Sequence, residues 1–369
     1  MRSEQSRPYI GGQAVLEGVM MRAPAAFAVV VRRLDGSLHV RMRGMADRKG
    51  GPARWPFIRG IAGVVESLRL GSEALRFSAE QIETDLAGHP RRSPGLGVLS
   101  ALGLMVFALL TRDEGRPTNR TPASTHRAGA SGFVMLAIAI AFFVALPQGA
   151  AAAANRMFQM GLEVQSAWFQ AMTGAIKLVV VVTYLLVIRR VPEIRRVFQY
   201  HGAEHKTIST YEAGEALTVE NARPKTTLHP RCGTTFLVMV ALVSILVFTV
   251  VGAALPRIHT GNALLDNVVF FTEKLPFLPV LVALTFELQR LFAQRASGGP
   301  LRALLWPGFL VQRITTAEPD DSQLEVALAS LRATLARPDR SDGAFNAADL
   351  RYPSFEALVA AQASARAAR

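Results

Sequence analysis

Four long apolar blocks dominate the pattern of hydrophobic and polar positions along this chain. They cover residues 132–154, 174–188, 234–255 and 275–292. A helix that crosses a bilayer needs about 20 consecutive apolar residues, and each block reaches or approaches that length. A fifth block, residues 95–110, is shorter and rich in glycine and alanine. The pattern predicts an α-helical polytopic membrane protein with about four transmembrane helices.

Basic residues gather beside these blocks, and their distribution predicts the topology. Arginine and lysine are frequent in residues 1–92, and residues 189–231 open with a run of arginines. The loops of residues 155–173 and 256–267 carry one arginine each. Basic loops stay in the cytoplasm. We therefore expect the two arginine-poor loops outside a bacterial inner membrane, and both chain termini on its cytoplasmic side. A crossing by residues 95–110 would break this pattern, so we interpret that block as re-entrant or interfacial. The alternative is a fifth span followed by a translocated loop.

Composition narrows the classes of partner. The chain has 369 residues, 50% of them hydrophobic, and a formal net charge of +13. In a soluble protein such a charge would indicate a nucleic-acid partner. Here the basic residues flank the apolar blocks, so we expect the lipid bilayer and other membrane proteins as partners, and no nucleic acid. The single cysteine, Cys232, excludes an intrachain disulfide. Residues 1–13 lack the apolar run of a signal peptide, so internal segments are expected to direct insertion.

Short-range patterns predict a small α+β cytoplasmic region at the N-terminus. Residues 26–33 and 37–43 flank the turn-forming pair Asp35-Gly36 and predict a β-hairpin. Residues 57–84 predict a helix. Its expected inward stripe consists of Ile61, Val64, Val65, Leu68 and Leu75.

The C-terminal region predicts one amphipathic helix and a tail. The helix covers residues 321–336 and is capped by Asp321 or Ser322. Its inward positions are Leu324, Leu328, Leu331 and Leu335. Beyond Pro338 the tail is rich in alanine and arginine, and we expect it to be disordered.

These patterns divide the chain into six segments. They are a cytoplasmic α+β region (1–92), a short apolar segment with a polar insertion (93–131), a transmembrane hairpin (132–190), an interfacial helix with a His/Cys loop (191–233), a second transmembrane hairpin (234–293) and a cytoplasmic C-terminal region (294–369).

Histidines cluster with the cysteine at one predicted membrane boundary. Pro192 can start a helix just after the second crossing. Helical spacing then places five side chains on one stripe: Ile194, Phe198, His201, His205 and Ile208. His201 and His205 are one turn apart, close enough to share a metal ion, and His229 and Cys232 could supply further ligands. The alternative is that the histidines are satisfied core residues and the cysteine a small buried residue.

Glu204 adds a candidate general base to the two histidines. The spacing His201-x-x-Glu204-His205 matches the inverted zinc-peptidase pattern, in which the glutamate acts on a metal-bound water. This short pattern is weakly specific by itself, and its clustering with His229 and Cys232 strengthens it.

A second unusual run covers residues 11–22. It combines glycines, which permit close backbone approach, with the polar residues Gln13, Glu17 and Arg22. The run predicts either a tight structural turn or a binding loop.

The sequence resembles the YqhQ-like family of bacterial membrane proteins, a domain of unknown function catalogued as predicted metal-dependent enzymes. The matching runs are residues 11–22, 59–60, 195–206, 211–221, 228–234 and 307–321. The resemblance implies a membrane protein with a metal-dependent activity that uses the His, Glu and Cys residues named above. Two features depart from the family. One is the polar insertion of residues 112–131, and the other is Phe286, which stands before Glu287 where the family leads us to expect a tyrosine.

We therefore predict a divalent-metal site at the cytoplasmic boundary of the membrane, with zinc as the expected ion. The candidate ligands are His201, His205 and His229, with Cys232 or Glu287 as the fourth. Glu287 is a candidate because an ionisable residue near the end of a span is costly unless it has a partner. Glu204 is the candidate general base of a hydrolase whose substrate the sequence does not specify. One alternative is a non-enzymatic scaffold or assembly factor in which the cluster is structural. A transporter is another alternative. It is weaker because the spans hold few ionisable residues, chiefly Lys177 and Glu287.

Overall fold

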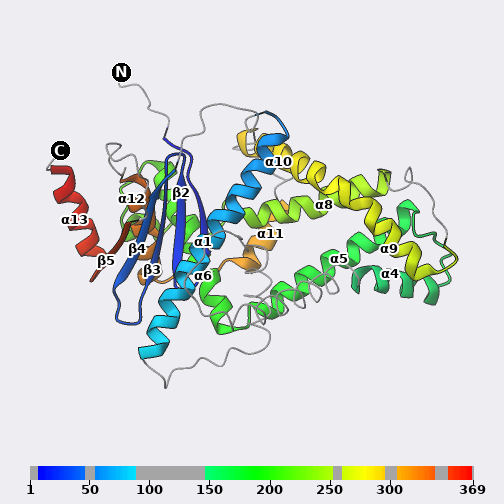
Figure 1. Cartoon of the computed structure of the whole chain (residues 1–369), viewed down its shortest axis with the longest axis horizontal. Coiled ribbons are helices and arrows are strands. Elements are labelled where there is room, and N and C mark those ends of the chain that lie inside the picture. Colours follow the sequence, from blue (N-terminus) through cyan, green and yellow to red (C-terminus); the bar gives the residue numbers. More distant parts are fainter. Residues whose placement is uncertain are drawn as a thin grey trace, which may run out of the picture.

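The computed structural model describes residues 7–45, 55–88, 146–251, 260–295, 306–336 and 348–367. These residues form a β-sheet domain with helices on both faces, and an arm of apolar helices that extends from it (Figure 1). Segments from both ends of the chain build the sheet domain, whereas the arm comes from the middle of the sequence.

An antiparallel sheet of five strands, in the order β1-β2-β3-β4-β5, lies at the centre of the domain. The strands are β1 (Gly11–Val15), β2 (Gly18–Ala23), β3 (Ala26–Arg32), β4 (Leu38–Gly44) and β5 (Ala348–Tyr352). The predicted hairpin is confirmed as β3 and β4, with Val30 opposite Val40. The carboxylate of Asp35 accepts hydrogen bonds from the backbone N–H and the hydroxyl of Ser37. Such a bond imitates a backbone turn and so helps to set the register of the hairpin.

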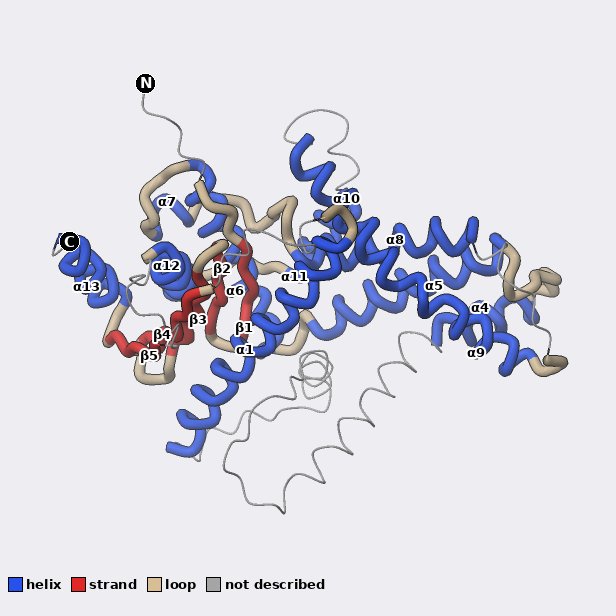
Figure 2. The backbone as a smooth tube through the Cα atoms, turned by 45° about the horizontal axis from the view of Figure 1, so that its top comes forward, coloured by secondary structure: helices blue, strands red, loops and turns tan. Residues whose placement is uncertain are grey.

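Both faces of the sheet are covered, which explains why β3 is apolar at nearly every position rather than at alternate ones. Helices α12 (Asp321–Leu335) and α6 (Pro192–Ala213) pack on one face, and helix α1 (Ile58–Gly88) packs on the other. Figure 2 shows α12 and α1 on opposite sides of the strands. Within β2, Met21 belongs to the core under α12 and Met20 to the core under α1, as the alternation of strand side chains requires.

Helix α12 contributes its predicted leucines to this core. Leu324, Leu328 and Leu331 are fully buried, and Leu335 packs beside them. The helix is capped by Asp320, whose carboxylate accepts a hydrogen bond from the backbone N–H of Gln323 at 2.9 Å. The Gln323 amide oxygen accepts one from the N–H of Asp320 in return. The predicted caps, Asp321 and Ser322, are therefore wrong. Ser322 also has an acidic partner three residues later, Glu325, but that carboxylate pairs with Arg32 of β3 instead.

Helix α1 is confirmed, but most of its predicted inward stripe is wrong. Val65 is 60% exposed, and Ile61 and Leu68 are also exposed, whereas Leu75 packs against the core as predicted. The residues that face the sheet are Leu70, Ala74 and Phe77. The difference arises because only the second half of α1 packs on the sheet, whereas its first half packs on helix α10 (Leu278–Arg295). Gly60 permits this second contact, because a Cβ there would lie 2.9 Å from the Cβ of Phe286.

Three helices in the described part of the chain are long and apolar enough to cross a membrane. They are α5 (Ala167–Ile188), α8 (Gly233–Val251) and the segment Val268–Leu291, which joins the end of α9 (Ala263–Lys274) through a 3-10 turn (Leu275–Phe277) to α10. No more than 24% of the most apolar window of any of them is buried. Apolar side chains on this scale need a nonaqueous surrounding, so the three helices support the predicted association with a membrane.

The remaining predicted blocks are only partly covered. Of residues 132–154, the structure describes the last nine, within α4 (Leu146–Met157). Residues 95–110 and 112–131 lie outside the described residues.

The predicted disorder of the tail is wrong for residues 348–367. This stretch forms β5 and helix α13 (Phe355–Ala367), and Leu358 is buried in the core around α12. The strand pairs with β4, which would otherwise be an unprotected sheet edge. Arg41 and Asp349 also form an ion pair across the two strands at 2.7 Å.

We expect the α12 core to dominate the stability of the sheet domain. Leu328→Ala should lower the free energy of unfolding by about 2–5 kcal/mol, because the side chain is fully buried. Leu34→Ala, at an exposed position in the β3–β4 turn, is the matched control and should change it by less than about 0.5 kcal/mol. A urea titration in which hydrogen–deuterium exchange of β2 and β3 reports unfolding measures both changes. Equal effects of the two substitutions would contradict the prediction.

Candidate metal centre

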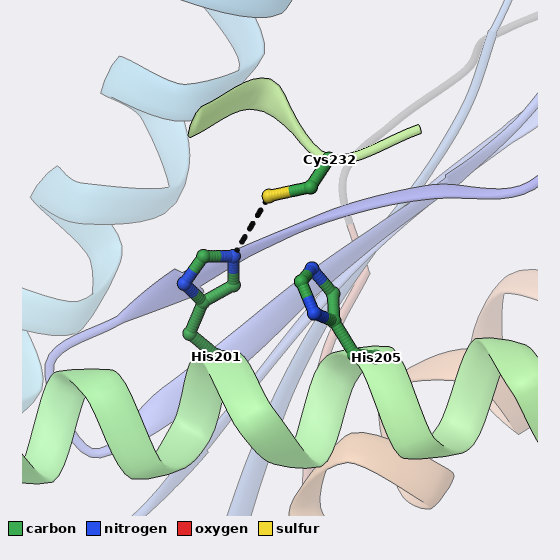
Figure 3. A group of neighbouring side chains, drawn as sticks. All are labelled: His201, His205 and Cys232. Carbon is green, nitrogen blue, oxygen red and sulfur yellow. Dashed lines mark hydrogen bonds between the residues drawn. The ribbon is translucent and has the colours of Figure 1, made fainter. Parts of the chain in front are cut away.

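Helix α6 brings the two histidines beneath the start of α8. Pro192 occupies its first turn, as predicted, and Gly214 ends it in the left-handed conformation with φ 80°. His201 and His205 lie one turn apart on this helix, and Cys232 immediately precedes α8. Figure 3 shows both imidazoles directed toward the region of the thiol.

The side chains of His201, His205 and Cys232 form one compact group. Their candidate ligand atoms all lie within 4.8 Å of one another, and the Nε2 of His201 is 3.1 Å from the Cys232 Sγ. Bonds from zinc to nitrogen or sulfur are about 2.0–2.3 Å, so the ligand atoms of a tetrahedral ion lie about 3.3–3.7 Å apart. The group is somewhat wider than this, so its side chains would draw together by a few tenths of an ångström or more around an ion.

Both histidines are oriented by backbone carbonyl groups. The Nδ1 of His201 lies 2.9 Å from the carbonyl oxygen of Thr315, and the Nδ1 of His205 hydrogen-bonds to that of Thr227. Donation from Nδ1 leaves each Nε2 as the atom that faces the group, which is the usual arrangement of a metal-ligating histidine. The Nε2 of His205 is buried and has no hydrogen-bond partner among the described residues. An orphaned atom of this kind costs about 1–3 kcal/mol unless something binds it.

Cys232 is held in an environment that favours its thiolate. The backbone N–H of Thr234 donates to its Sγ at 3.4 Å, and the thiol lies at the N-terminus of α8, where the helix dipole favours negative charge. Burial raises the pKa of Cys232, but the neighbouring His201 and His205 imidazoles together lower it by more, so the pKa lies well below its usual value. Burial lowers the pKa of His201, yet Cys232, Glu204 and the carbonyl group of Thr315 together outweigh this effect and raise that pKa to about 9. Each member of the pair thus favours the charged form of the other.

Glu204 is buried next to this group. Its carboxyl group forms no hydrogen bond with the described residues, and burial raises its pKa to about 8 against the opposing charge of His201. The side chain lies against Gly12 of β1, where a Cβ would come within 2.6 Å of the Glu204 Oε1. The glycine therefore makes the room that the carboxyl group occupies.

His229 lies beside the group of three but outside it. Its ring centroid is 5.7 Å from that of His205. Its Nε2 is 3.3 Å from the Oε2 of Glu212, and its Nδ1 accepts a hydrogen bond from the backbone N–H of Arg231 at 3.4 Å. Gln312 holds the backbone of His229 through both its N–H and its carbonyl group.

Glu287 also lies outside the group. Its carboxylate binds the Nε of Arg59 at 2.7 Å and accepts a hydrogen bond from the backbone N–H of Phe57. The structure therefore gives Glu287 a partner on α1, at the contact where Phe286 packs on Gly60.

The polar residues of the run 11–22 attach the β1–β2 hairpin to its neighbours. Glu17 forms two hydrogen bonds with Arg196 of α6, at 2.6 and 2.5 Å. Arg22 pairs with Glu66 of α1 at 2.6 Å, and Gln13 lies against Gly71 of the same helix. All three contacts are those expected of the structural interpretation rather than of an open binding loop.

Sequence reasoning missed several residues that shape the site. The carbonyl groups of Thr315 and Thr227 orient the histidines through backbone atoms, which leave no side-chain signal. Gln312 is fully buried and holds both His229 and Thr235. Its position within the matching run 307–321 was the available signal.

Comparisons with known proteins identify the family. The family model described as "Protein of unknown function (DUF1385)" matches residues 55–337. The "Uncharacterized protein YqhQ" of Bacillus subtilis (strain 168) is 30% identical over 349 residues, which cover 91% of this chain and 95% of that protein. No solved structure matches. The chain belongs to the YqhQ-like family, as its sequence motifs predicted.

We expect the group of three to retain zinc through purification. Loss of a residue that only hydrogen-bonds to a metal ligand lowers metal affinity by roughly 10–100-fold. His205→Ala should lower zinc affinity by more than this, because it removes a ligand itself. His39→Ala is the matched control, since its Nε2 is also buried without a partner but belongs to no such group among the described residues. Elemental analysis of the detergent-purified variants beside the wild type decides. Equal zinc in His205→Ala and the wild type would remove His205 from the site.

Proposed function

We propose that this chain is an inner-membrane protein with a divalent-metal site formed by His201, His205 and Cys232. The observation that carries the proposal is the buried, unpartnered Nε2 of His205 beside a thiolate-favouring cysteine. Imidazole and thiolate together suit zinc better than magnesium or calcium, which prefer oxygen ligands. The chemistry of the donor set therefore fits the ion that the sequence predicts.

The favoured activity is a metal-dependent hydrolysis. Three protein ligands leave one position of a tetrahedral zinc ion open for water, and bound zinc lowers the pKa of such a water to about 7. Glu204 is adjacent and hydrogen-bonds to none of the described residues, so its carboxylate, once ionised, would be available to take a proton. A cation nearby would also favour the ionised form of this buried carboxyl group.

A structural site is the second candidate. His229 lies close enough to His205 to become a fourth ligand after rotation of its ring, and four protein ligands are typical of structural zinc. In that case the ion would fasten α6 to the start of α8, and the sheet domain would serve as an assembly platform.

The packing of the sheet domain supports an even number of crossings. β4 pairs with β5 and α6 packs on β1, so the N-terminal region, α6 and the C-terminal region share one side of any membrane. Two crossings, α8 and Val268–Leu291, separate α6 from the C-terminal region. Among the described spans only α5 separates α6 from the N-terminal region, so one more crossing is needed before it. We assign it to residues 132–154, which leaves residues 95–110 re-entrant or interfacial.

Reporter fusions test this topology of four crossings with both termini in the cytoplasm. Thr125 and Thr218 should report a cytoplasmic position, and Ser166 and Thr260 a position outside, because the basic regions stay inside. A signal outside the membrane at Thr125 would assign the first crossing to residues 95–110 instead. A cytoplasmic signal at Ser166 would exclude α5 as a span.

Glu204→Gln distinguishes the hydrolase from the scaffold. The substitution keeps the size of the side chain but removes its ability to accept a proton. For a general base, zinc content and folding should survive while activity falls by about 10²–10⁴-fold. Glu193→Gln, in the first turn of the same helix and outside the group of three, is the control. Because the substrate is unknown, the readout is complementation of a strain that lacks the native gene.

Two outcomes would contradict the hydrolase. One is full complementation by Glu204→Gln at wild-type protein levels. The other is a loss of zinc affinity of about 10–100-fold, which would make Glu204 an orienting partner of a histidine.

A further inference from the structure

A second polar site lies at the junction of α5 and α6, away from the metal centre. A cavity of about 260 Å³ opens there, and its lining residues are Arg189, Arg190 and Arg195. Arg189 caps the C-terminus of α5, and Arg195 belongs to the first turns of α6. The cavity is smaller than the roughly 300–1,000 Å³ of sites for drug-sized ligands. Its size and its lining suit a small anion.

None of the three arginines that line this cavity forms an ion pair with a carboxylate of the described residues. Arg196, the next residue in the chain, binds Glu17 through two hydrogen bonds. Arg190 and Arg195 have no such partner in the described part of the chain, and Arg189 donates only to the neutral carbonyl oxygen of Arg313, at 2.8 Å. Converging like charges repel one another, so an anion that binds all three would be stabilised.

The surroundings of the cavity are apolar and lie at the end of a candidate span. Leu186 and Val187, in the last turn of α5, are exposed. Helix α11 (Trp306–Thr315) packs beside α5, and its Trp306 is 57% exposed. Exposed tryptophan and arginine on neighbouring helices at the end of a candidate span are typical of the level at which a membrane protein meets lipid headgroups.

We propose that this cavity binds the phosphate of an anionic phospholipid headgroup. The planar guanidinium groups offer paired N–H donors that match phosphate oxygens, and basic pockets beside membrane helices bind phospholipids in this way. The acyl chains of the lipid would lie along the exposed apolar side chains of α5. A free phosphate ion has the same charge chemistry but gains nothing from this apolar border, which is why the lipid is the assigned source. The inference rests on the proposed membrane insertion and is independent of the metal site.

Binding of phosphatidylglycerol to the full chain in detergent tests the proposal, with phosphatidylcholine as the lipid control and native mass spectrometry as the readout. Arg190→Gln/Arg195→Gln removes two charges at exposed positions. Each arginine near a membrane surface contributes about a fivefold change in affinity, so we expect about 25-fold weaker binding of phosphatidylglycerol. Arg223→Gln/Arg351→Gln removes the same charge at exposed, ion-paired positions and should leave the affinity unchanged.

The wild type alone also tests the proposal, in case the double variant does not fold. It should prefer phosphatidylglycerol over phosphatidylcholine, and this preference should weaken as salt is added. Equal binding of the two lipids, or equal losses in the two double variants, would overturn the proposal. Displacement of the lipid by inorganic phosphate at equal concentration would assign the site to free phosphate and overturn the lipid source. Recovery of the chain in the soluble fraction would overturn both this site and the proposed membrane insertion, whereas loss of lipid preference in a membrane-extracted chain would overturn this site alone.

Discussion

The shared core of the two chain ends is the constraint on which the other features depend. Strands β1–β4 from the N-terminus and α12 and β5 from the C-terminus bury one another, with Leu324, Leu328 and Leu331 against the sheet. Neither half could keep these leucines from water without the other, at roughly 1.5–3 kcal/mol for each such side chain. Because the two chain ends share one core, they must lie on the same side of any membrane, and the segment between them must cross it an even number of times. The topology of the apolar arm thus follows from a soluble core outside it.

Helix α6 connects this core to the candidate metal centre, because it packs on the sheet and also carries the two histidines. On the side of the sheet, Tyr200 is fully buried and its hydroxyl lies 3.2 Å from the Oε2 of Glu17. On the side of the apolar arm, His201 and His205 meet Cys232 at the start of α8. The hairpin β1–β2 therefore sets the position of the histidines although it contributes no ligand. Its glycine at position 12 also determines how closely Glu204 can approach the sheet.

Features with a local cause could be predicted from the sequence, and features that depend on distant partners could not. The β3–β4 hairpin, the leucine stripe of α12 and the spacing of His201 and His205 follow from turn chemistry and helical periodicity. The inward stripe of α1 could not be predicted, because two different neighbours, the sheet and α10, divide the helix between them. The order of the tail depends on β4, more than 300 positions earlier in the chain. The sequence suggested His229 and Glu287 as ligands. In the structure the side chain of His229 contacts Glu212, and that of Glu287 binds Arg59. No local sequence pattern predicts either contact.

The environment of Glu204 favours an enzyme over a scaffold more than the coordination number does. His229 could reach the ion by giving up its contact with Glu212, at a cost of about 0.5–1.5 kcal/mol for one hydrogen bond. Zinc binding releases far more free energy, about 10–16 kcal/mol in structural zinc peptides, so the position of His229 alone does not exclude a closed site. A structural site, however, does not require a buried carboxyl group that no described residue binds. Burying Glu204 raises its pKa to about 8, so the fold loses stability at neutral pH, where the same group is ionised in the unfolded chain. A proton acceptor beside a metal-bound water is the role in which that cost has a function.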